Sequence, residues 1–288
     1  MSTLMIGTSA WNDHDPFYPP GIKPAEQLSF YARYFPIVEV NSTYYGIPRR
    51  QVVESWVRRT PDGFVFDVKP PRELTSTPEK PRGEAPTPDA DVAARFHEAI
   101  SPLAESGRLG AVTFQFPPSY RNTEEHQDYI RLLPELLPAL PLSVEFRRID
   151  WMDEEHADDT LRLLHETGLS YTMVDEPQFG TGSVPPVYAV TNPRLALIRF
   201  HGRNAETWYR FTGSSRERFN WLYSAEELEE WTPKIEAALQ AAAAVHVFFN
   251  TNGADQGPRN AYRLMDVLGI EHPPLPEDER AEQPRLIE

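Results

Sequence analysis

The sequence predicts an α/β fold in which eight parallel strands, joined by helices, close into a single (β/α)8 barrel. Eight short apolar segments of strand length recur along the 288 residues, and segments with helical periodicity separate most of them. Strands that alternate with helices pair in parallel through right-handed crossovers. Apolar and polar residues alternate along most of these strands, whereas strands of an open sheet covered on both sides are apolar on both faces. These three observations together predict the closed barrel.

The strand segments come first in this prediction. They span residues 4–11, 37–45, 64–69, 109–116, 142–147, 170–175, 195–201 and 245–250. Alternation along each strand directs one set of side chains to the helices and the other set to the barrel interior. Eight such units in a chain of this length are typical of the TIM barrel, whose active site lies at the carboxyl ends of its strands.

Helical segments lie between most of the strands. They span residues 24–35, 49–59, 89–105, 123–140, 153–167, 225–243 and 259–268. Ser224 and Glu227 form a capping box, which marks the start of the helix at residue 225. Residues 177–193, between the sixth and seventh strands, are rich in Pro and Gly. We therefore expect the sixth crossover to be irregular and to lack a helix.

The expected domain organisation is one barrel domain over residues 1–270. Residues 76–88 follow the third strand, are polar and rich in Pro, and form either a lid or a disordered loop insertion. Residues 271–288 are acidic and rich in Pro with little apolar content, which is typical of a solvated C-terminal tail.

The composition excludes several classes of protein. With 0 Cys, the chain has no disulfide, thiolate zinc site, iron–sulfur cluster or cysteine nucleophile. Its 28 Lys+Arg and 43 Asp+Glu leave a net charge of −15, which repels a polyanion and argues against a nucleic-acid partner. The apolar segments are too short to cross a membrane, and the first residues lack the features of a secretory signal. We therefore expect a cytoplasmic protein that is not bound to a membrane.

The alternating pattern also predicts a polar barrel interior. The charges on this face of the strands nearly cancel, so they can pair inside the lumen. The predicted lumen residues are Glu39, Asn41, Asp67, Lys69, Thr113, Gln115, Glu145, Arg147, Asp175, Arg199, His201 and Asn250.

Eight sequence motifs resemble those of a known family. In chain order they are IGTSAW, VEVNSTYY, FVFDVKPPREL, LGAVTFQFPP, SVEFRR followed by Trp151, IRFHGR, YSAEELEEW and VFFNTNGADQGPRNA. They cover residues 4–266 and resemble the family named domain of unknown function 72, a group of bacterial and archaeal TIM-barrel proteins. The resemblance implies a barrel similar to the isomerase and endonuclease barrels, and it implies no particular reaction. The chain departs from the family pattern at Arg148, where a histidine is common, and at Thr251, where a second asparagine is common.

Several basic residues lie at or just after the carboxyl ends of the predicted strands. They are Lys69, Arg72, Arg147, His201 and Arg203. One interpretation is a clamp for an anionic ligand such as phosphate or carboxylate, because a guanidinium group binds two oxygens at once. The other interpretation is internal ion pairing with Glu145, Asp67 and Asp175. Three of the five come from alternate strands, which contribute to one layer in this fold.

Glu145, Asp175 and His201 form the candidate catalytic group. They belong to the fifth, sixth and seventh strands, and neighbouring strands lie about 4.8 Å apart, so we expect the three side chains to converge. Such a group can act as general acid and base, hold a hard metal ion, or form a structural network. Because no second histidine stands at ligand spacing, we expect no bound metal and no other cofactor.

The amides Asn41, Gln115 and Asn250 are candidate ligand-binding residues, because an amide both donates and accepts hydrogen bonds and suits a sugar hydroxyl or the edge of a nucleobase. Trp11 and Tyr44 lie near the ends of the first two strands and can stack on such a ligand. The alternative is that aromatic side chains plug the barrel mouth. Histidines on predicted helices are interpreted as surface residues. They are His97, His126, His156 and His165.

These features lead to three hypotheses of function. The first is an enzyme, a hydrolase or isomerase, that applies acid–base chemistry to a small polar, anionic, sugar- or nucleotide-like ligand. In this hypothesis Glu145 is the base, His201 is the partner acid, and Lys69 and Arg147 stabilise charge. The second is a metal-dependent endonuclease-like barrel that acts on nucleic acid, against which the net charge argues. The third is a non-catalytic protein that binds a small molecule.

Overall fold

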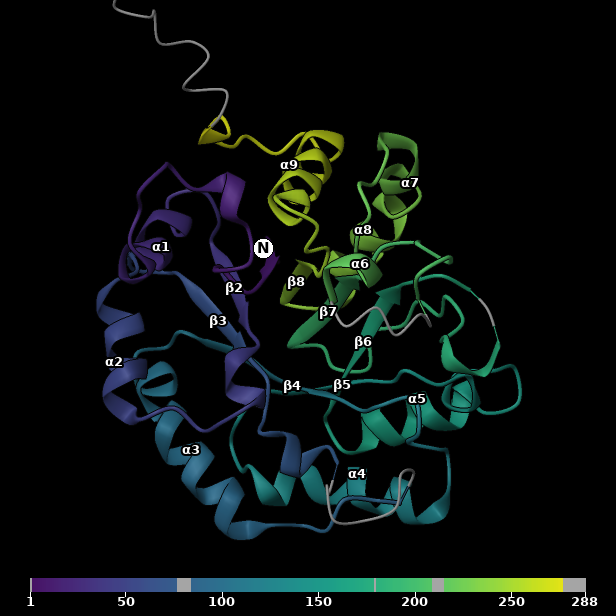
Figure 1. The fold of residues 1–288 in the computed structure, drawn as a ribbon. Coiled ribbons are helices and arrows are strands. Elements are labelled where there is room, and N and C mark those ends of the chain that lie inside the picture. Colours follow the sequence, from purple (N-terminus) through teal and green to yellow (C-terminus); the bar gives the residue numbers. More distant parts are fainter. Residues whose placement is uncertain (1, 77–83, 179, 209–214, 277–288) are drawn as a thin grey trace, which may run out of the picture.

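The structure, a computed structural model, describes residues 2–76, 84–178, 180–208 and 215–276 and shows a closed barrel of eight parallel strands (Figure 1). The strands are β1 (Thr3–Ser9), β2 (Ile37–Val40), β3 (Val65–Val68), β4 (Leu109–Gln115), β5 (Leu142–Glu145), β6 (Ser170–Asp175), β7 (Leu195–Phe200) and β8 (Ala244–Phe249). Each strand pairs in parallel with its neighbours in chain order, and β8 closes the barrel against β1. The predicted (β/α)8 TIM barrel is confirmed.

Helices surround the barrel (Figure 1). The α-helices of the described residues are α1 (Pro24–Tyr31), α2 (Arg50–Arg58), α3 (Ala90–Glu105), α4 (Glu124–Leu136), α5 (Ala157–Glu166), α6 (Ser215–Arg218), α7 (Ala225–Glu229), α8 (Thr232–Ala241) and α9 (Gln256–Val267). Between β6 and β7 the described residues form one short 3-10 turn, Gly180–Gly182, and no α-helix. The irregular sixth crossover is therefore confirmed.

The helix predicted over residues 225–243 is in fact two helices. The predicted capping box is present: the Ser224 hydroxyl accepts a hydrogen bond from the Glu227 N–H, and the Glu227 carboxylate accepts one from the Ser224 N–H. The chain turns at Trp231, and Pro233 lies in the first turn of α8. Proline has no N–H to continue the ladder of the preceding helix, so the break falls here. The break buries Trp231, whose indole N–H reaches Asp175 at the end of β6.

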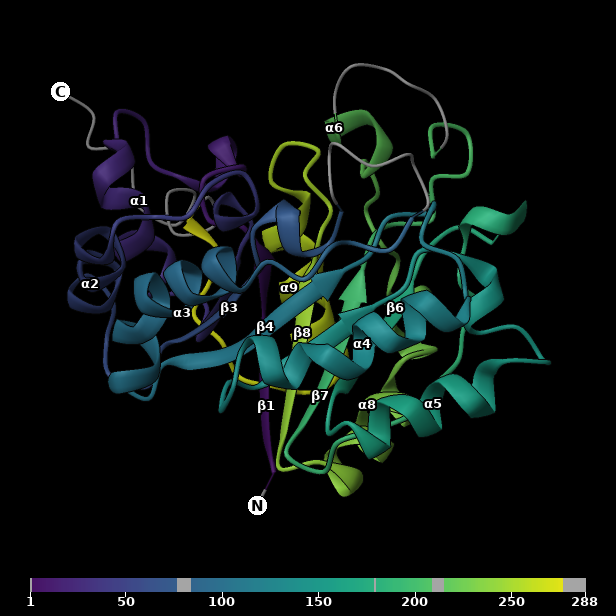
Figure 2. The ribbon, with the colours of Figure 1, turned by 90° about the horizontal axis from the view of Figure 1, so that it is seen from below.

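The side chains inside the barrel change from apolar to charged along the barrel axis. Outward side chains such as Phe66, Phe114 and Val144 belong to the main apolar core, together with residues of the helices. A separate apolar cluster, formed by Ala111, Leu195 and Leu197, fills the lumen towards the amino ends of the strands. Charged side chains take over towards the carboxyl ends. Figure 2 shows α6 at this end of the barrel, opposite the N-terminus.

Parts of the two segments that were predicted to lie outside the barrel fall outside the described residues. These parts are residues 77–83 of the predicted insertion and residues 277–288 of the predicted tail. Within the part of the chain that the structure describes, every helix is too short or too polar to cross a membrane.

Candidate functional site

Arg199 is the centre of the charged lumen. Its guanidinium group is fully buried on β7 and reaches three other strands. One nitrogen, Nη2, donates to Glu39 Oε2 at 2.7 Å, and the other, Nη1, donates to Gln115 Oε1 at 2.9 Å and pairs with Glu145. Glu39 Oε2 also accepts from the Ser9 hydroxyl at 2.8 Å. One cation thus joins β1, β2, β4 and β5 across the barrel.

Glu145 is enclosed by cations and by one imidazole. Arg147 Nη1 donates to Glu145 Oε1 at 3.0 Å, and His201 Nε2 lies 3.1 Å from the same oxygen. Burial alone would raise the pKa of Glu145, but Arg199, His201 and Arg147 outweigh burial and hold this pKa well below its ordinary value. Glu145 is therefore a permanent carboxylate whose two oxygens are both occupied.

His201 is fully buried and uncharged. Burial lowers its pKa to about 3, although Glu145 opposes this shift. The neutral ring donates from Nε2 to Glu145, and Nδ1 accepts from the Asn250 amide at 3.0 Å. Both ring nitrogens are therefore engaged within the protein, and Asn250 serves to hold the ring.

Arg147 extends the network to the sixth strand. Its Nη2 lies 3.1 Å from Glu176 Oε2, and its guanidinium group lies 4.9 Å from the centroid of the Trp208 ring. Glu176 Oε1 accepts from the Val184 N–H at 2.8 Å, so the irregular sixth crossover is bound to this carboxylate. Burial raises the pKa of Glu176 to about 7, although Arg147 opposes the shift.

The expected convergence of Glu145, Asp175 and His201 is wrong for Asp175. This carboxylate lies outside the lumen and accepts hydrogen bonds from Arg203 Nη2 at 2.7 Å, the Tyr223 hydroxyl at 2.6 Å and the Trp231 indole at 2.8 Å. The lumen position at the end of β6 belongs to the next residue, Glu176. Asp175 and Glu176 are adjacent acids in the sequence. Asp175 lies on the outward face of β6, next to α7 and α8, and is therefore not in the barrel.

Two of the predicted clamp residues lie away from the lumen. Arg203 pairs with Asp175 at 2.7 Å and with Glu230 at 2.8 Å. Arg72 is an exposed residue of the 3-10 turn Arg72–Leu74, and among the described residues it pairs with Glu73 at 3.9 Å. Both follow strand ends in the sequence, but the loop path after the strand directs them outwards. The predicted five-residue clamp is therefore wrong as a single cluster.

Lys69 differs from the other lumen cations. It follows β3 and is half-buried, and its Nζ donates to Gln115 Oε1 at 2.9 Å. Among the described residues no carboxylate lies within 4.0 Å of this ammonium group, whereas Arg147 and Arg199 each contact two. Burial and the neighbouring Arg199 lower the pKa of Lys69 to about 8. Among the described residues, one N–H of the Lys69 ammonium group donates to a side chain, so the others are available to a ligand.

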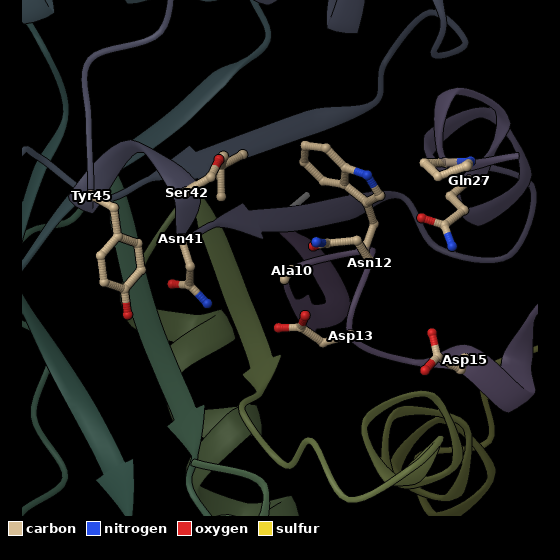
Figure 3. Close-up of a pocket in the computed structure, with 11 residues that line it drawn as sticks. Ala10, Asn12, Asp13, Asp15, Gln27, Asn41, Ser42 and Tyr45 are labelled. Atoms are coloured by element: carbon tan, nitrogen blue, oxygen red, sulfur yellow. The ribbon is translucent and has the colours of Figure 1, made fainter. Parts of the chain in front are cut away.

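A cavity of about 660 Å³, lined by both polar and apolar groups, lies on this side of the barrel mouth. Its walls come mainly from the loops after β1 and β2 and include Trp11, Asn12, Asp13, Gln27, Asn41 and Tyr45. Figure 3 shows Asn41 and Asp13 projecting towards the same open space, with Tyr45 at its edge. Asn41 continues the lumen face of β2 beside Lys69, since Glu39 is paired in register with Asp67. Its Oδ1 is buried without a hydrogen-bond partner in the described structure.

The aromatic candidates fall around this cavity. Trp11 lines it and packs edge-on against Trp56, with 5.8 Å between the ring centroids. Tyr44 packs edge-on against Tyr45 at 5.3 Å, and Tyr45 itself is 82% exposed. Tyr45 is therefore the freer of the two tyrosines to meet a ligand.

Sequence reasoning missed three features of the interior. Glu176 was assigned no role, although the alternation through Thr172 would have placed it in the lumen. His246 on β8 lies 3.0 Å from Asp67 Oδ2 and forms a second buried pair beneath the network. His126 was interpreted as a surface residue but is buried on α4, because Tyr120 packs over it at the start of the helix. In the described part of the chain, no three His, Asp or Glu side chains are grouped as metal ligands.

Comparison with known proteins identifies the family. The profile described as "Protein of unknown function DUF72" matches residues 5–285. The UPF0759 protein YunF of Bacillus subtilis is 33% identical over 273 residues, covering 93% of this chain and 96% of that protein. A DUF72 family protein of Enterococcus faecalis superposes with a TM-score of 0.84 at 28% identity, covering 99% of this chain and 100% of that structure. Another from Thermotoga maritima gives 0.79 at 32% identity, with coverage of 93% and 99%. This chain belongs to the DUF72 family.

Proposed function

We propose that this chain is a cytoplasmic enzyme that binds a small polar, anionic ligand at the barrel mouth and transfers a proton there, as a hydrolase or an isomerase. One observation carries the proposal: Lys69 presents an ammonium group at the carboxyl end of β3 with a single side-chain hydrogen bond and no carboxylate within 4.0 Å among the described residues. A half-buried cation without a counter-ion is costly unless a ligand supplies one.

The structure supports a different division of roles from that expected from the sequence. Glu145 is held as a carboxylate by three partners, and His201 is a neutral ring with both nitrogens engaged. Neither group is poised to exchange a proton near neutral pH. We therefore assign Glu145, His201 and Arg199 as positioning residues that hold the lumen rigid. The proton-transfer role passes to Lys69, whose pKa of about 8 suits a general acid near neutral pH.

The cavity that Asn41 lines, next to Lys69 in the strand register, supports a sugar-like ligand. Its lining combines amides, carboxylates and a hydroxyl with the aromatic rings of Trp11 and Tyr45. Amides and carboxylates hydrogen-bond to hydroxyl groups, and aromatic faces pack on the apolar face of a sugar ring. The lining contains Asp13 and Asp15 and no cation, so a negative group of the ligand belongs at Lys69 rather than in the cavity.

Calorimetric titration with inorganic phosphate and with ribose 5-phosphate tests the ligand class. Lys69→Met removes a charged hydrogen bond, which contributes about 1.5–3 kcal/mol, so we expect phosphate affinity to fall roughly 10- to 150-fold. Lys69→Arg keeps the charge and should stay within a few-fold of wild type. Lys234→Met on α8 is the matched control and should have no effect. Equal affinity of the wild type and Lys69→Met would show that Lys69 is not the anion site.

Proton transfer is tested separately from binding. Sugar phosphates are incubated with the protein in deuterium oxide, and NMR follows exchange at carbon next to the carbonyl group. Deuterium incorporation with the wild type, and none with Lys69→Met, would support an enzyme. Phosphate binding that depends on Lys69, without exchange or turnover of any sugar phosphate, would favour the alternative of a non-catalytic binding protein. Nothing in the described residues favours the endonuclease-like alternative, since no metal-ligand group is present among them.

A further inference from the structure

The choice of lysine at position 69 stands out in this chain. Of the 28 basic residues only four are lysines, at positions 23, 69, 80 and 234, and all others are arginines. The two arginines of the lumen, Arg147 and Arg199, are both paired with carboxylates. Lysine therefore occupies the lumen position where, among the described residues, the cation has no carboxylate. A primary amine can do chemistry that a guanidinium group cannot.

The surroundings of Lys69 make its neutral amine easier to form than that of an exposed lysine. Lys69 Nζ and Arg199 Nη1 both donate to the same oxygen, Gln115 Oε1, each at 2.9 Å, so the ammonium and guanidinium groups are close neighbours. Their repulsion and the burial of the lysine both oppose its charged form. A lysine beside another cation in a desolvated site is the usual arrangement of an amine nucleophile.

Building on the proposed function, we propose that Lys69 forms an imine with an aldehyde or ketone ligand bound at the barrel mouth. The Nζ lone pair attacks the carbonyl carbon and forms a C–N bond, while one N–H hydrogen moves to the carbonyl oxygen to give a carbinolamine. The hydroxyl group then leaves with the second N–H hydrogen as water, and the C=N bond forms. These steps need no oxidant or reductant.

The lumen holds groups that complement this chemistry. The amine must first lose the third proton of the ammonium group to solvent, since no carboxylate among the described residues lies within 4.0 Å of Nζ. On β2, the strand next to β3, Glu39 Oε1 and Asn41 Oδ1 are buried acceptor atoms without hydrogen-bond partners in the described structure, so they can accept hydrogen bonds from a ligand. The imine takes up a proton from solvent, so the positive charge stays at Nζ beside the negative group of the ligand. The protonated imine withdraws electrons from the neighbouring carbon and makes its C–H acidic. The ligand class is therefore a small carbonyl compound with a negative group, such as an open-chain sugar phosphate.

Reductive trapping of the imine provides the test. The low lysine content leaves few other side-chain amines that could react. In a variant with Lys23, Lys80 and Lys234 all changed to Arg, Lys69 is the sole lysine. This protein is incubated with glycolaldehyde phosphate and sodium cyanoborohydride, and intact mass and peptide mapping locate the product. We expect one secondary amine at Lys69, formed faster than at the α-amino group and faster as the pH rises towards 8. Lys69→Arg in the wild-type background should give no product at this position.

Outcomes for the two proposals are separable. Product at Lys69 no faster than at Lys23 or Lys234 of the wild type would overturn the imine. If phosphate binding is nevertheless lost in Lys69→Met and kept in Lys69→Arg, the proposed function stands and the imine alone fails. If phosphate affinity is also unchanged in Lys69→Met, the site itself is wrong. Circular dichroism and the midpoint of thermal unfolding verify that each variant is folded.

Discussion

The two sides of the barrel mouth use charge in opposite ways. On the β5–β7 side, Arg147 and Arg203 are bound by carboxylates of Glu145, Glu176, Asp175 and Glu230. On the β1–β3 side, Lys69 has one side-chain hydrogen bond among the described residues. Its register neighbour Asn41 lines a cavity. The β5–β7 side pairs its cations with carboxylates of the protein, whereas Lys69 on the β1–β3 side has no carboxylate within 4.0 Å among the described residues.

This difference separates a structural role from a binding role. Paired buried charges position one another, and breaking a pair leaves an uncompensated charge, so the β5–β7 side holds the barrel in one arrangement. A half-buried cation without a counter-ion is costly unless a ligand supplies one, as at Lys69. We therefore assign a structural role to the β5–β7 side and ligand binding to the β1–β3 side. Three predictions test this assignment.

The largest expected effect is that of Arg199→Met on stability. This change leaves Glu39 and Glu145 buried without their shared guanidinium group. We expect the free energy of unfolding to fall by about 3–5 kcal/mol, measured by urea denaturation. The control is Arg162→Met, which breaks an exposed pair with Asp159 and should cost less than about 1 kcal/mol. Equal losses for the two variants would mean that the network does not stabilise the barrel.

The next effect concerns Glu176 and pH. Burial raises the pKa of Glu176 from 4.5 to about 7, with Arg147 and the Val184 N–H opposing the shift and Glu145 and Asp175 adding to it. The folded state therefore holds a proton that the unfolded state loses between these values. The contribution of Glu176 to the free energy of unfolding is therefore fully present below pH 4.5 and is lost as the pH rises through 7. The total loss is about 3 kcal/mol.

Glu176→Gln should remove this dependence. We expect the wild type to lose stability relative to Glu176→Gln as the pH rises from 4.5 to 8, measured as the free energy of unfolding at each pH. Glu236→Gln on the exposed face of α8 is the control and should follow the wild type. Parallel pH profiles for the wild type and Glu176→Gln would show that Arg147 keeps Glu176 ionised throughout, and that the β5–β7 side is fully charged.

The smallest effect is expected at Tyr45, on the β1–β3 side. Tyr45→Ala removes an exposed ring, so the free energy of unfolding should change by less than about 0.5 kcal/mol. Loss of ring packing on the ligand should weaken ribose 5-phosphate binding roughly 2- to 10-fold, corresponding to about 0.5–1.5 kcal/mol. Tyr188→Ala, at the edge of a smaller cavity on the other side, should leave this affinity unchanged. The reverse ranking of the two variants would move the ligand to the β5–β7 side.

Much of the barrel could be predicted from the sequence, and the exceptions have identifiable causes. Alternation correctly placed Glu39, Glu145 and Arg199 in the lumen, because strand parity is a local property of the chain. It failed at Asp175 and Glu176. Of two adjacent acids on a strand, one faces the lumen and the other faces outward, and the sequence does not show which one is which. Arg72 follows a strand end in the sequence, but the loop path that directs it outwards is not encoded by periodicity.

The sequence by itself determined the eight strands, their order, the closed barrel, the irregular sixth crossover and a lumen in which charges nearly cancel. Strand and helix periodicity and capping are short-range, so they can be recognised without the fold. The tertiary structure alone decided which carboxylate each cation meets. That choice depends on which strands face one another across the lumen, as Arg199 on β7 does with Glu39 on β2. It also left Lys69 as the lumen cation without a carboxylate among the described residues, and so indicated the site.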